Sequence, residues 1–139
     1  MRQKSGEIIV QTQGKGLVEV TSILANWLDQ SGVQEGLLNI LIQHTSASLT
    51  IQENADPDVV LDLADFYEKV APEGNGRYRH SSEGPDDMPS HIRASLTDVS
   101  LSIPVLGGRM RLGTWQGIYV FEHRTRPHER RLALHVMGD

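Results

Sequence analysis

The stretch from residue 78 to residue 95 carries the side chains of this sequence that are best suited to chemistry. It reads YRHSSEGPDDMPSHIRAS and holds two histidines, His80 and His91, with three acidic residues between them. Imidazole nitrogens and carboxylate oxygens are common ligands of divalent metals, and the same groups can move protons. A stretch this polar is either a solvated loop or the lining of a site.

His91 is the more informative of the two histidines because of its place in the chain. Pro89 is expected to open a short helix that runs to about Leu96. The positive end of the helix dipole disfavours a charged imidazole, so we expect His91 to be neutral, as metal binding or general-base work requires. The alternative is that Asp86 and Asp87 only cap this helix.

His44 belongs to a second polar pattern, in the alternating segment 43–51, QHTSASLTI. On an extended chain His44 would share one side with Ser46, Ser48 and Thr50. Hydroxyls two and four positions after a histidine could orient a phosphate or a metal-bound water. The alternative is a histidine that is hydrogen-bonded on a half-exposed sheet face.

These patterns together predict a site that collects three histidines. His44, His80 and His91 could bind a divalent metal, zinc or magnesium, with Asp87 in support, and zinc would lie about 2.0–2.1 Å from each ring nitrogen. No H-x-x-x-H spacing brings the rings together locally, so they would have to converge through the fold. Alternatively, the same three histidines could bind a phosphate or sulfate ion instead of a metal.

A strand is predicted over residues 115–123, which read WQGIYVFEH. We interpret Trp115 as a packing residue, and Glu122 either as the ion-pair partner of an arginine or as a site carboxylate. Gly113 and Gly117 flank Trp115, which indicates a bulge or a close backbone approach.

The remaining histidines give a weaker signal for a site. On its predicted strand His123 shares one side with Trp115, Tyr119 and Phe121, and His135 falls on the last predicted strand. His128 lies in RTRPHERR, whose charges predict a solvated turn that could attract an anion.

The composition excludes several classes of function. The 139 residues carry a formal net charge of -5, which argues against a nucleic-acid-binding protein that works through a basic surface. Cysteine is absent, so disulfides, thiolate metal sites and cysteine nucleophiles are excluded. There is no signal-peptide pattern and no run of about 18 apolar residues, so we expect a cytoplasmic protein without a membrane span.

The length predicts a single domain that covers residues 1–139. Strands are expected at 7–12, 17–20, 37–42, 43–51, 101–105, 118–122 and 131–137. The pair Gly107-Gly108 predicts a two-residue hairpin turn. Because parallel β-α-β units are not evident, the order of elements favours an α+β fold.

Two longer helices complete the predicted elements. Thr21 or Ser22 can cap the first, which should end at Gly32. Asp56 can cap the second helix, which has an apolar stripe at helical spacing. Pro72 prevents this helix from continuing.

Four segments of the sequence resemble the YjbQ-like family. They are HTSASLTIQENADPDV at 44–59, YRHSSEGPDDMPSHIRASL at 78–96, SIPVLGGRMRLGTWQGIYVFEHR at 102–124 and the closing RRLALHVMGD. The resemblance covers essentially the whole chain. It implies an α+β domain with a YjbQ-like β-sandwich core of antiparallel strands and two or three helices. It also implies a homotrimer, in which sites can form between subunits.

The resemblance further implies which residues form the site. It assigns catalytic roles to His44, His91 and Asp87, metal ligation to His44, His80 and His91, and ligand binding to Thr45, Ser46, Asn54, Trp115 and Glu122. The sequence has Asp98 where the family commonly has a glycine or a turn, so we expect a modest loop change there.

Some members of the family are described as secondary thiamine-phosphate synthases. The resemblance therefore implies transfer of a hydroxymethylpyrimidine group to thiazole phosphate, with release of pyrophosphate. Such chemistry needs a divalent metal and basic groups to stabilise the leaving group. The sequence has no glycine-rich phosphate loop and no DDxxD-like cluster, so two alternatives stay open. One is a non-enzymatic protein that binds a metal or a phosphorylated metabolite, and the other is a metal-dependent hydrolase of unknown substrate.

Overall fold

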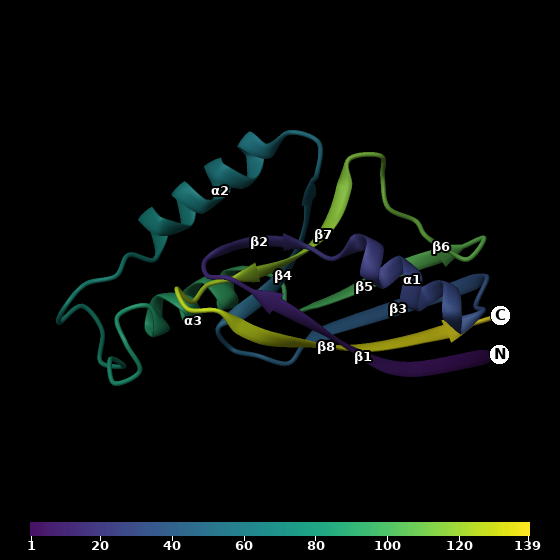
Figure 1. The fold of residues 1–139 in the computed structure, drawn as a ribbon, viewed down its shortest axis with the longest axis horizontal. Coiled ribbons are helices and arrows are strands. Elements are labelled where there is room, and N and C mark those ends of the chain that lie inside the picture. The colour runs from purple at the N-terminus through teal and green to yellow at the C-terminus, as the bar shows by residue number, and fades with distance from the viewer.

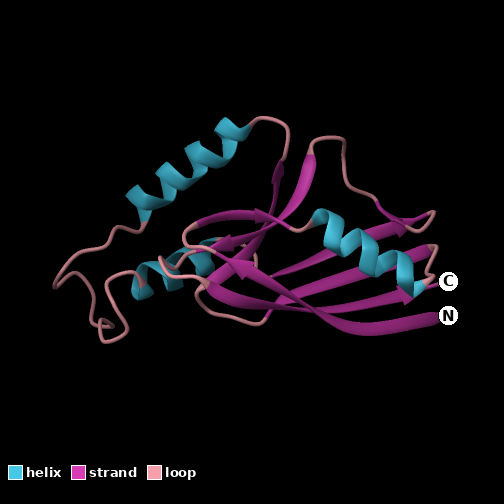
Figure 2. Ribbon diagram, viewed as in Figure 1, coloured by secondary structure: helices cyan, strands magenta, loops and turns pink.

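The computed structural model describes all residues from Met1 to Asp139 and contains two antiparallel sheets and three helices (Figures 1 and 2). The larger sheet has the strand order β1-β8-β3-β5-β6, and the smaller sheet has the order β2-β7-β4. The strands are β1 (Arg2–Thr12), β2 (Gly16–Glu19), β3 (Glu35–Ile42), β4 (Ala47–Glu53), β5 (Ser100–Leu106), β6 (Arg109–Met110), β7 (Gln116–Glu122) and β8 (His128–Gly138). The expected α+β class with antiparallel strands is confirmed.

The three helices are α1 (Thr21–Ser31), α2 (Pro57–Val70) and α3 (Asp87–Leu96). Figure 1 shows α1 lying against the larger sheet, α2 projecting from the body, and α3 at the end of the molecule opposite the two termini. None of the helices is long and apolar enough to cross a membrane.

The hydrophobic core lies between the inner faces of the two sheets and α1. Leu24 and Leu28 of α1 are fully buried, and they pack in one cluster with strand residues from both sheets, such as Leu38, Leu49 and Val120. Alternate positions of each strand point to opposite faces, so the other face of the larger sheet is left outside this core. The core therefore resembles a β-sandwich with one helix in its second layer.

The outer face of the larger sheet is not covered by any element of the chain. Ile9, Leu41, Leu106 and Met137 stand on this face and are 38–49% exposed. Polar side chains such as Asn39 and His135 lie between these apolar ones, so the exposed apolar surface of this face is interrupted.

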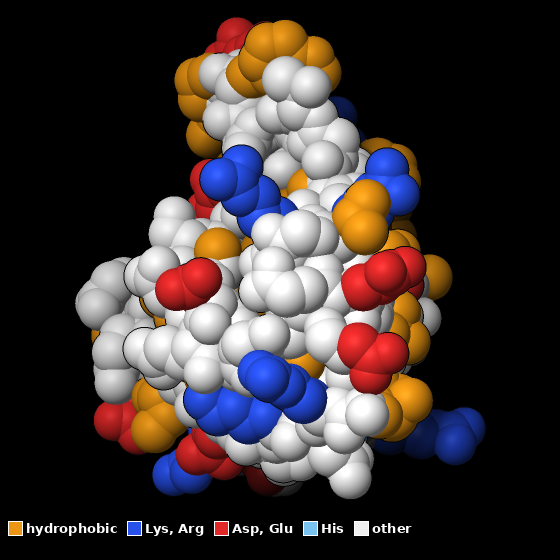
Figure 3. Space-filling view, turned by 90° about the vertical axis from the view of Figure 1, so that its right-hand side faces the viewer, with side chains coloured by type: hydrophobic (Ala, Val, Ile, Leu, Met, Phe, Trp, Pro, Cys, Tyr) orange, Lys and Arg blue, Asp and Glu red, His pale blue; other side chains and the backbone are white.

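Helix α2 forms where the sequence predicts it but is buried less than its apolar stripe suggests. Asp56 caps it by accepting a hydrogen bond from the Asp58 amide at 2.9 Å, as expected. No residue of α2 is buried, and Phe66 is 54% exposed. The Tyr67 ring, edge-on to Phe121 with 5.3 Å between centroids, connects the helix to the smaller sheet. Figure 3 shows hydrophobic side chains gathered at the top of the molecule, where the end of α2 and the start of β7 both lie.

Local turn signals in the sequence are confirmed. Gly32 ends α1 in the left-handed conformation with φ 75°. Gly107 and Gly108 have φ values of 63° and 73° and join β5 to β6, as a two-residue hairpin of the predicted kind requires. Neither Thr21 nor Ser22 caps α1, however, because the helix already begins at Thr21 and Val20 is at the N-cap position. The Thr21 hydroxyl donates to the Glu19 carboxylate at 2.8 Å.

The predicted strand over 43–51 is wrong in its first part. Strand β4 begins only at Ala47, and the pairing of β3 with β8 stops at Ile42. The reason is that the Arg131 amide donates at 2.8 Å to Nε2 of the His44 ring. The histidine side chain thus accepts the hydrogen bond that a backbone carbonyl would accept in a continued strand. His44 therefore lies in a loop.

Several further boundaries differ from the sequence-based predictions, and β1, for example, begins at Arg2 and not at residue 7. Helix α3 begins at Asp87, two residues before Pro89. Strand β8 begins at His128, so part of the charged segment RTRPHERR is sheet and not turn. Arg130 within it is only 3% exposed because its guanidinium pairs with the buried Glu122.

We predict that Gly117→Val lowers the free energy of unfolding by about 1–3 kcal/mol, the usual magnitude for overpacking. A Cβ at Gly117 would stand 2.7 Å from Oε2 of Glu19 and 3.1 Å from Cβ of Asn54. Gly113→Val is the matched control, because a Cβ there meets only the end of the Gln116 side chain, at 3.3 Å. Urea unfolding measures both, and equal stabilities of Gly117→Val and the native protein would contradict the prediction.

Candidate metal centre

Asp87 lies between two histidines. Its Oδ2 is 2.5 Å from Nε2 of His80 and 3.1 Å from Nε2 of His91, and the two rings are edge-to-face with 5.3 Å between their centroids. One donor atom from each of the three residues lies within 4.8 Å of the others. The predicted meeting of His80 and His91 with Asp87 in support is thus present within one chain.

Helix α3 and the connection before it position these three side chains. Asp87 and His91 are four residues apart at the start of α3, so both point from the same face of the helix. His80 comes from the connection between α2 and α3, which folds back over the start of α3. The stretch that the sequence marked as loop or site is therefore a structured connection that brings His80 to Asp87 and His91.

Arg124 fixes the two acidic residues from the other side. Its Nη1 donates to Oδ1 of Asp87 at 2.5 Å and its Nε donates to Oδ2 of Asp86 at 2.9 Å. The amide of Thr125 donates to the same Asp86 oxygen at 2.9 Å. The turn after β7 is thereby attached to the start of α3.

These contacts keep both carboxylates charged although they are almost fully buried. Burial alone would raise the pKa of Asp86, but hydrogen bonds from Thr125 and Arg124 outweigh it and lower that pKa to about 2. For Asp87, burial is likewise outweighed by the hydrogen bond with His80 and by the charge of Arg124, so its pKa is also lowered. Neither side chain caps α3, so the capping interpretation is wrong.

His44 does not belong to this cluster within one chain. Its Nε2 accepts the Arg131 amide, and burial followed by the charge of Arg130 lowers its pKa. It lines a separate hollow of about 580 Å³ together with Thr45 and Ser46. The structure therefore joins two of the three predicted histidine ligands and places the third elsewhere.

Glu122 is the partner in a buried ion pair, as one of the two interpretations of the sequence expected. Both of its oxygens contact the Arg130 guanidinium, at 2.7 and 2.5 Å, and Thr12 donates to Oε1 at 2.6 Å. Burial opposes the charge of Glu122, but these hydrogen bonds lower its pKa. Arg130 also contacts the Ser46 hydroxyl at 3.1 Å, so this pair holds the loop that carries His44.

Asn54 and Trp115 stand at the opposite end of the β4–β7 pair from Glu122. The amide of Asn54 donates to the Trp115 carbonyl at 3.0 Å just beyond the two strands. The seven residues of β7, at about 3.3 Å each, separate this end from Glu122 by roughly 20 Å. Trp115 is 62% exposed, so its interpretation as a packing residue is wrong for a single chain.

The family model described as UPF0047 protein YjbQ-like matches residues 6–139. The chain belongs to the YjbQ-like UPF0047 family. A UPF0047 protein of Synechocystis is 51% identical to it over 99% of this chain and 94% of that protein. The UPF0047 protein YjbQ of Escherichia coli O157:H7 is 44% identical over 95% of this chain and 96% of that protein.

Solved structures of similar proteins have the same fold. A YjbQ/UPF0047-family protein from Clostridium acetobutylicum superposes with a TM-score of 0.87 at 36% identity, over 95% of this chain and 99% of that one. A hypothetical protein from Aeropyrum pernix K1 gives a TM-score of 0.89 at 30% identity, over 98% and 99% of the two chains. The YjbQ-like resemblance stated from the sequence motifs is thereby confirmed.

Arg124 is the residue beside this candidate cluster that sequence reasoning missed. Arg124 closes the family-like segment IYVFEHR, but its acidic partners precede it by 38 and 37 positions, and no periodicity connects them. His123 is fully buried, and its Nε2 is 2.9 Å from the Ser48 hydroxyl. Burial, and then the charge of Arg93, lower its pKa to about 3, so it is neutral at physiological pH.

We predict that acid destabilises this protein through Asp86. Because the pKa of Asp86 falls from about 3.8 in the unfolded chain to about 2 in the fold, its contribution is complete above pH 3.8. That contribution is lost as the pH falls toward 2. In Asp86→Asn the free energy of unfolding should be lower at pH 6 and should change less between pH 4 and pH 2.

Urea unfolding at several pH values measures this difference. Asp62→Asn, on the exposed side of α2, is the matched control and should keep the native pH dependence. A native pH dependence in Asp86→Asn would show that Asp86 does not couple folding to protonation.

Proposed function

We propose that this protein binds one divalent metal ion through His80, Asp87 and His91 and uses it to act on a small phosphorylated metabolite. The observation that carries the proposal is the convergence of two imidazoles and one carboxylate, with donor atoms within 4.8 Å of one another. Three protein ligands with a further open position are the usual arrangement of a catalytic zinc site.

The chemistry of the donors favours zinc over magnesium. Magnesium prefers oxygen ligands and keeps several waters, whereas zinc readily takes imidazole nitrogen together with carboxylate oxygen. Around a tetrahedral zinc the donor atoms stand about 3.3 Å apart. The His91–Asp87 contact of 3.1 Å is close to that spacing, and the His80–Asp87 contact of 2.5 Å would have to widen.

The surroundings also suit a ligand that reaches the metal from solvent. The side chains of His80 and His91 are 42% and 33% exposed, while Asp87 is buried beneath them. Arg124 holds the second oxygen of Asp87 and so fixes the orientation of this carboxylate. A metal in this place would supply positive charge to a phosphate or pyrophosphate group.

The activity to test first is the one that the family resemblance implies, a thiamine-phosphate synthase-like transfer of hydroxymethylpyrimidine to thiazole phosphate. The site supports this activity only through its charge. Departure of pyrophosphate requires a cation, and the site offers ligands for a metal cation beside Arg124. Hydrolysis of a phosphorylated metabolite would use the same arrangement.

A second candidate function does not need turnover. The short contact between His80 and Asp87 is also that of a histidine hydrogen-bonded to a carboxylate in the absence of metal. A protein that binds a metal or a phosphorylated metabolite without converting it would show the same geometry.

We predict that the native protein binds one zinc ion per chain, and that Asp87→Asn and His91→Ala each weaken zinc binding by at least tenfold, as loss of one of three ligands should. His135→Ala is the matched control, because His135 lies on the outer sheet face beside Ser5. Isothermal titration with zinc measures the affinities.

The same proteins, loaded with zinc, are then assayed with the pyrimidine pyrophosphate and thiazole phosphate. Turnover that requires His91 favours the synthase. Zinc binding without turnover by the pure protein favours the binding function. Absence of zinc binding by the native protein would remove the metal centre from the proposal.

We also propose that the protein is a homotrimer, as the family resemblance implies. Exposed apolar side chains on the outer face of the larger sheet, such as Ile9 and Leu41, and on the unburied helix α2 support this, because assembly would remove them from water. Residues that stand apart in one chain, such as His44 and Trp115, could approach the site of another subunit.

We predict that sedimentation equilibrium at micromolar concentration gives the mass of three chains. Leu41→Lys places a charge on the outer sheet face, where Leu41 is 46% exposed, and should shift the protein toward the monomer. Asn75→Lys, in the connection after α2, is the control. A native protein that sediments as a monomer or dimer would contradict the proposal.

A further inference from the structure

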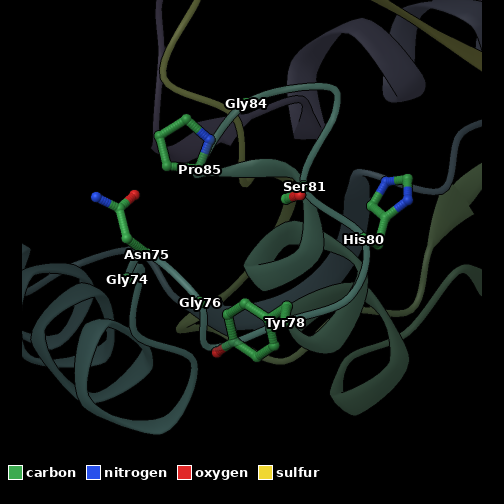
Figure 4. A pocket seen from close by; sticks show the side chains of 8 residues that line it. All are labelled: Gly74, Asn75, Gly76, Tyr78, His80, Ser81, Gly84 and Pro85. Atoms are coloured by element: carbon green, nitrogen blue, oxygen red, sulfur yellow. The ribbon is translucent and has the colours of Figure 1, made fainter.

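The connection between α2 and α3 encloses a pocket that shares only His80 with the metal cluster. The pocket has a volume of about 390 Å³, which is within the range of small-molecule sites. Figure 4 shows its two walls, one from residues 74–78 and the other from residues 81–85. Its lining consists of Gly74, Asn75, Gly76, Tyr78, His80, Ser81, Gly84 and Pro85.

The lining is unusual for a small-molecule pocket because it is almost entirely polar. None of its side chains is a carboxylate, and three of its residues are glycines, which leave the main chain accessible. The Asn75 amide and the Ser81 hydroxyl form no hydrogen bond within the protein, whereas the Tyr78 hydroxyl donates to the Pro72 carbonyl at 2.7 Å. Asn75 and Ser81 are thus free to donate to a ligand.

Two guanidinium groups stand behind these walls. Nε of Arg77 lies 3.1 Å from the point that a Cβ on Gly74 would occupy, and Nη2 of Arg124 lies 3.9 Å from the equivalent point on Gly84. Arg77 has no carboxylate partner. Oδ1 of Asp86 lies 3.1 Å from the same point on Gly84, and Arg124 is already paired with Asp86 and Asp87, so the available positive charge comes from Arg77. A carboxylate-free lining with the unpaired Arg77 next to Gly74 favours an anionic ligand.

We infer that this pocket binds the phosphate group of a small phosphorylated ligand. Donors reach it from both walls, an arrangement that suits a tetrahedral phosphate with several acceptor oxygens. The volume leaves room for an organic group beside the phosphate. This inference adds a phosphate subsite to the proposed function. It rests on that function only in assuming that the bound molecule also approaches the metal.

His80 connects the pocket with the metal centre. Its backbone lines the pocket, while its ring points away from the pocket, as Figure 4 shows, to reach Asp87. The phosphate would therefore bind on one side of residue 80 and the metal on the other. Occupation of the pocket would fix the backbone that holds one metal ligand.

Ser81→Asp tests the pocket, because it adds a negative charge to the lining without touching a metal ligand. Ser82→Asp is the matched control, since Ser82 adds the same charge one residue away and does not line the pocket. The probe is phenyl phosphate, titrated by NMR into metal-free and zinc-loaded protein. We expect Ser81→Asp to weaken its binding by at least tenfold and Ser82→Asp by less than threefold, with zinc affinity unchanged in both.

Arg77→Ala provides a second variant that adds no charge, and it should weaken phenyl phosphate severalfold. Native-like binding of phenyl phosphate to both Ser81→Asp and Arg77→Ala would overturn the inference. Benzoate is titrated in parallel, and equal affinity for benzoate would overturn the assignment to phosphate in favour of any carboxylate-sized anion. Zinc titration of the same samples keeps the two proposals apart. Phenyl phosphate that binds at Ser81 in a protein without zinc affinity would support the pocket while removing the metal centre.

Discussion

The contact of Arg124 with the paired carboxylates of Asp86 and Asp87 is the interaction on which the candidate site depends. Without this guanidinium, two buried negative charges would repel each other at the start of α3. With it, the turn after β7, the start of α3 and the connection that carries His80 form one unit. The same arginine leaves one oxygen of Asp87 directed at both histidines.

Local features of this fold were predictable because short stretches of sequence determine them. Asp56 before Pro57 gives the start of α2, and Gly107-Gly108 gives a hairpin, since each depends on backbone conformation and neighbouring amides. Prediction failed at His44, where a ring nitrogen accepts the Arg131 amide in place of a strand carbonyl. A hydrogen bond between residues so far apart in the sequence cannot be inferred from the alternation of polar and apolar side chains in a short segment.

The candidate site was predictable only in part for the same reason. Asp87 and His91 meet because they are four residues apart on α3, but the sequence-based helix began only at Pro89 and so left Asp87 outside it. The approach of His80 and Arg124 depends on how separate segments fold together. The family resemblance named Asn54 and Trp115 without saying where they lie, and one chain places them at the far end of β7.

The termini of the chain end beside each other on neighbouring strands. Arg2 pairs with Gly138 where β1 meets β8, and the terminal amine of Met1 is 3.3 Å from the Asp139 carboxylate. Figure 1 shows both at the end of the molecule away from α3. A short peptide could therefore join them and the chain could be reopened at the exposed Gly107-Gly108 turn. Such a circular permutant would keep every segment around Asp87 continuous while changing the order in which the sheet strands are synthesised.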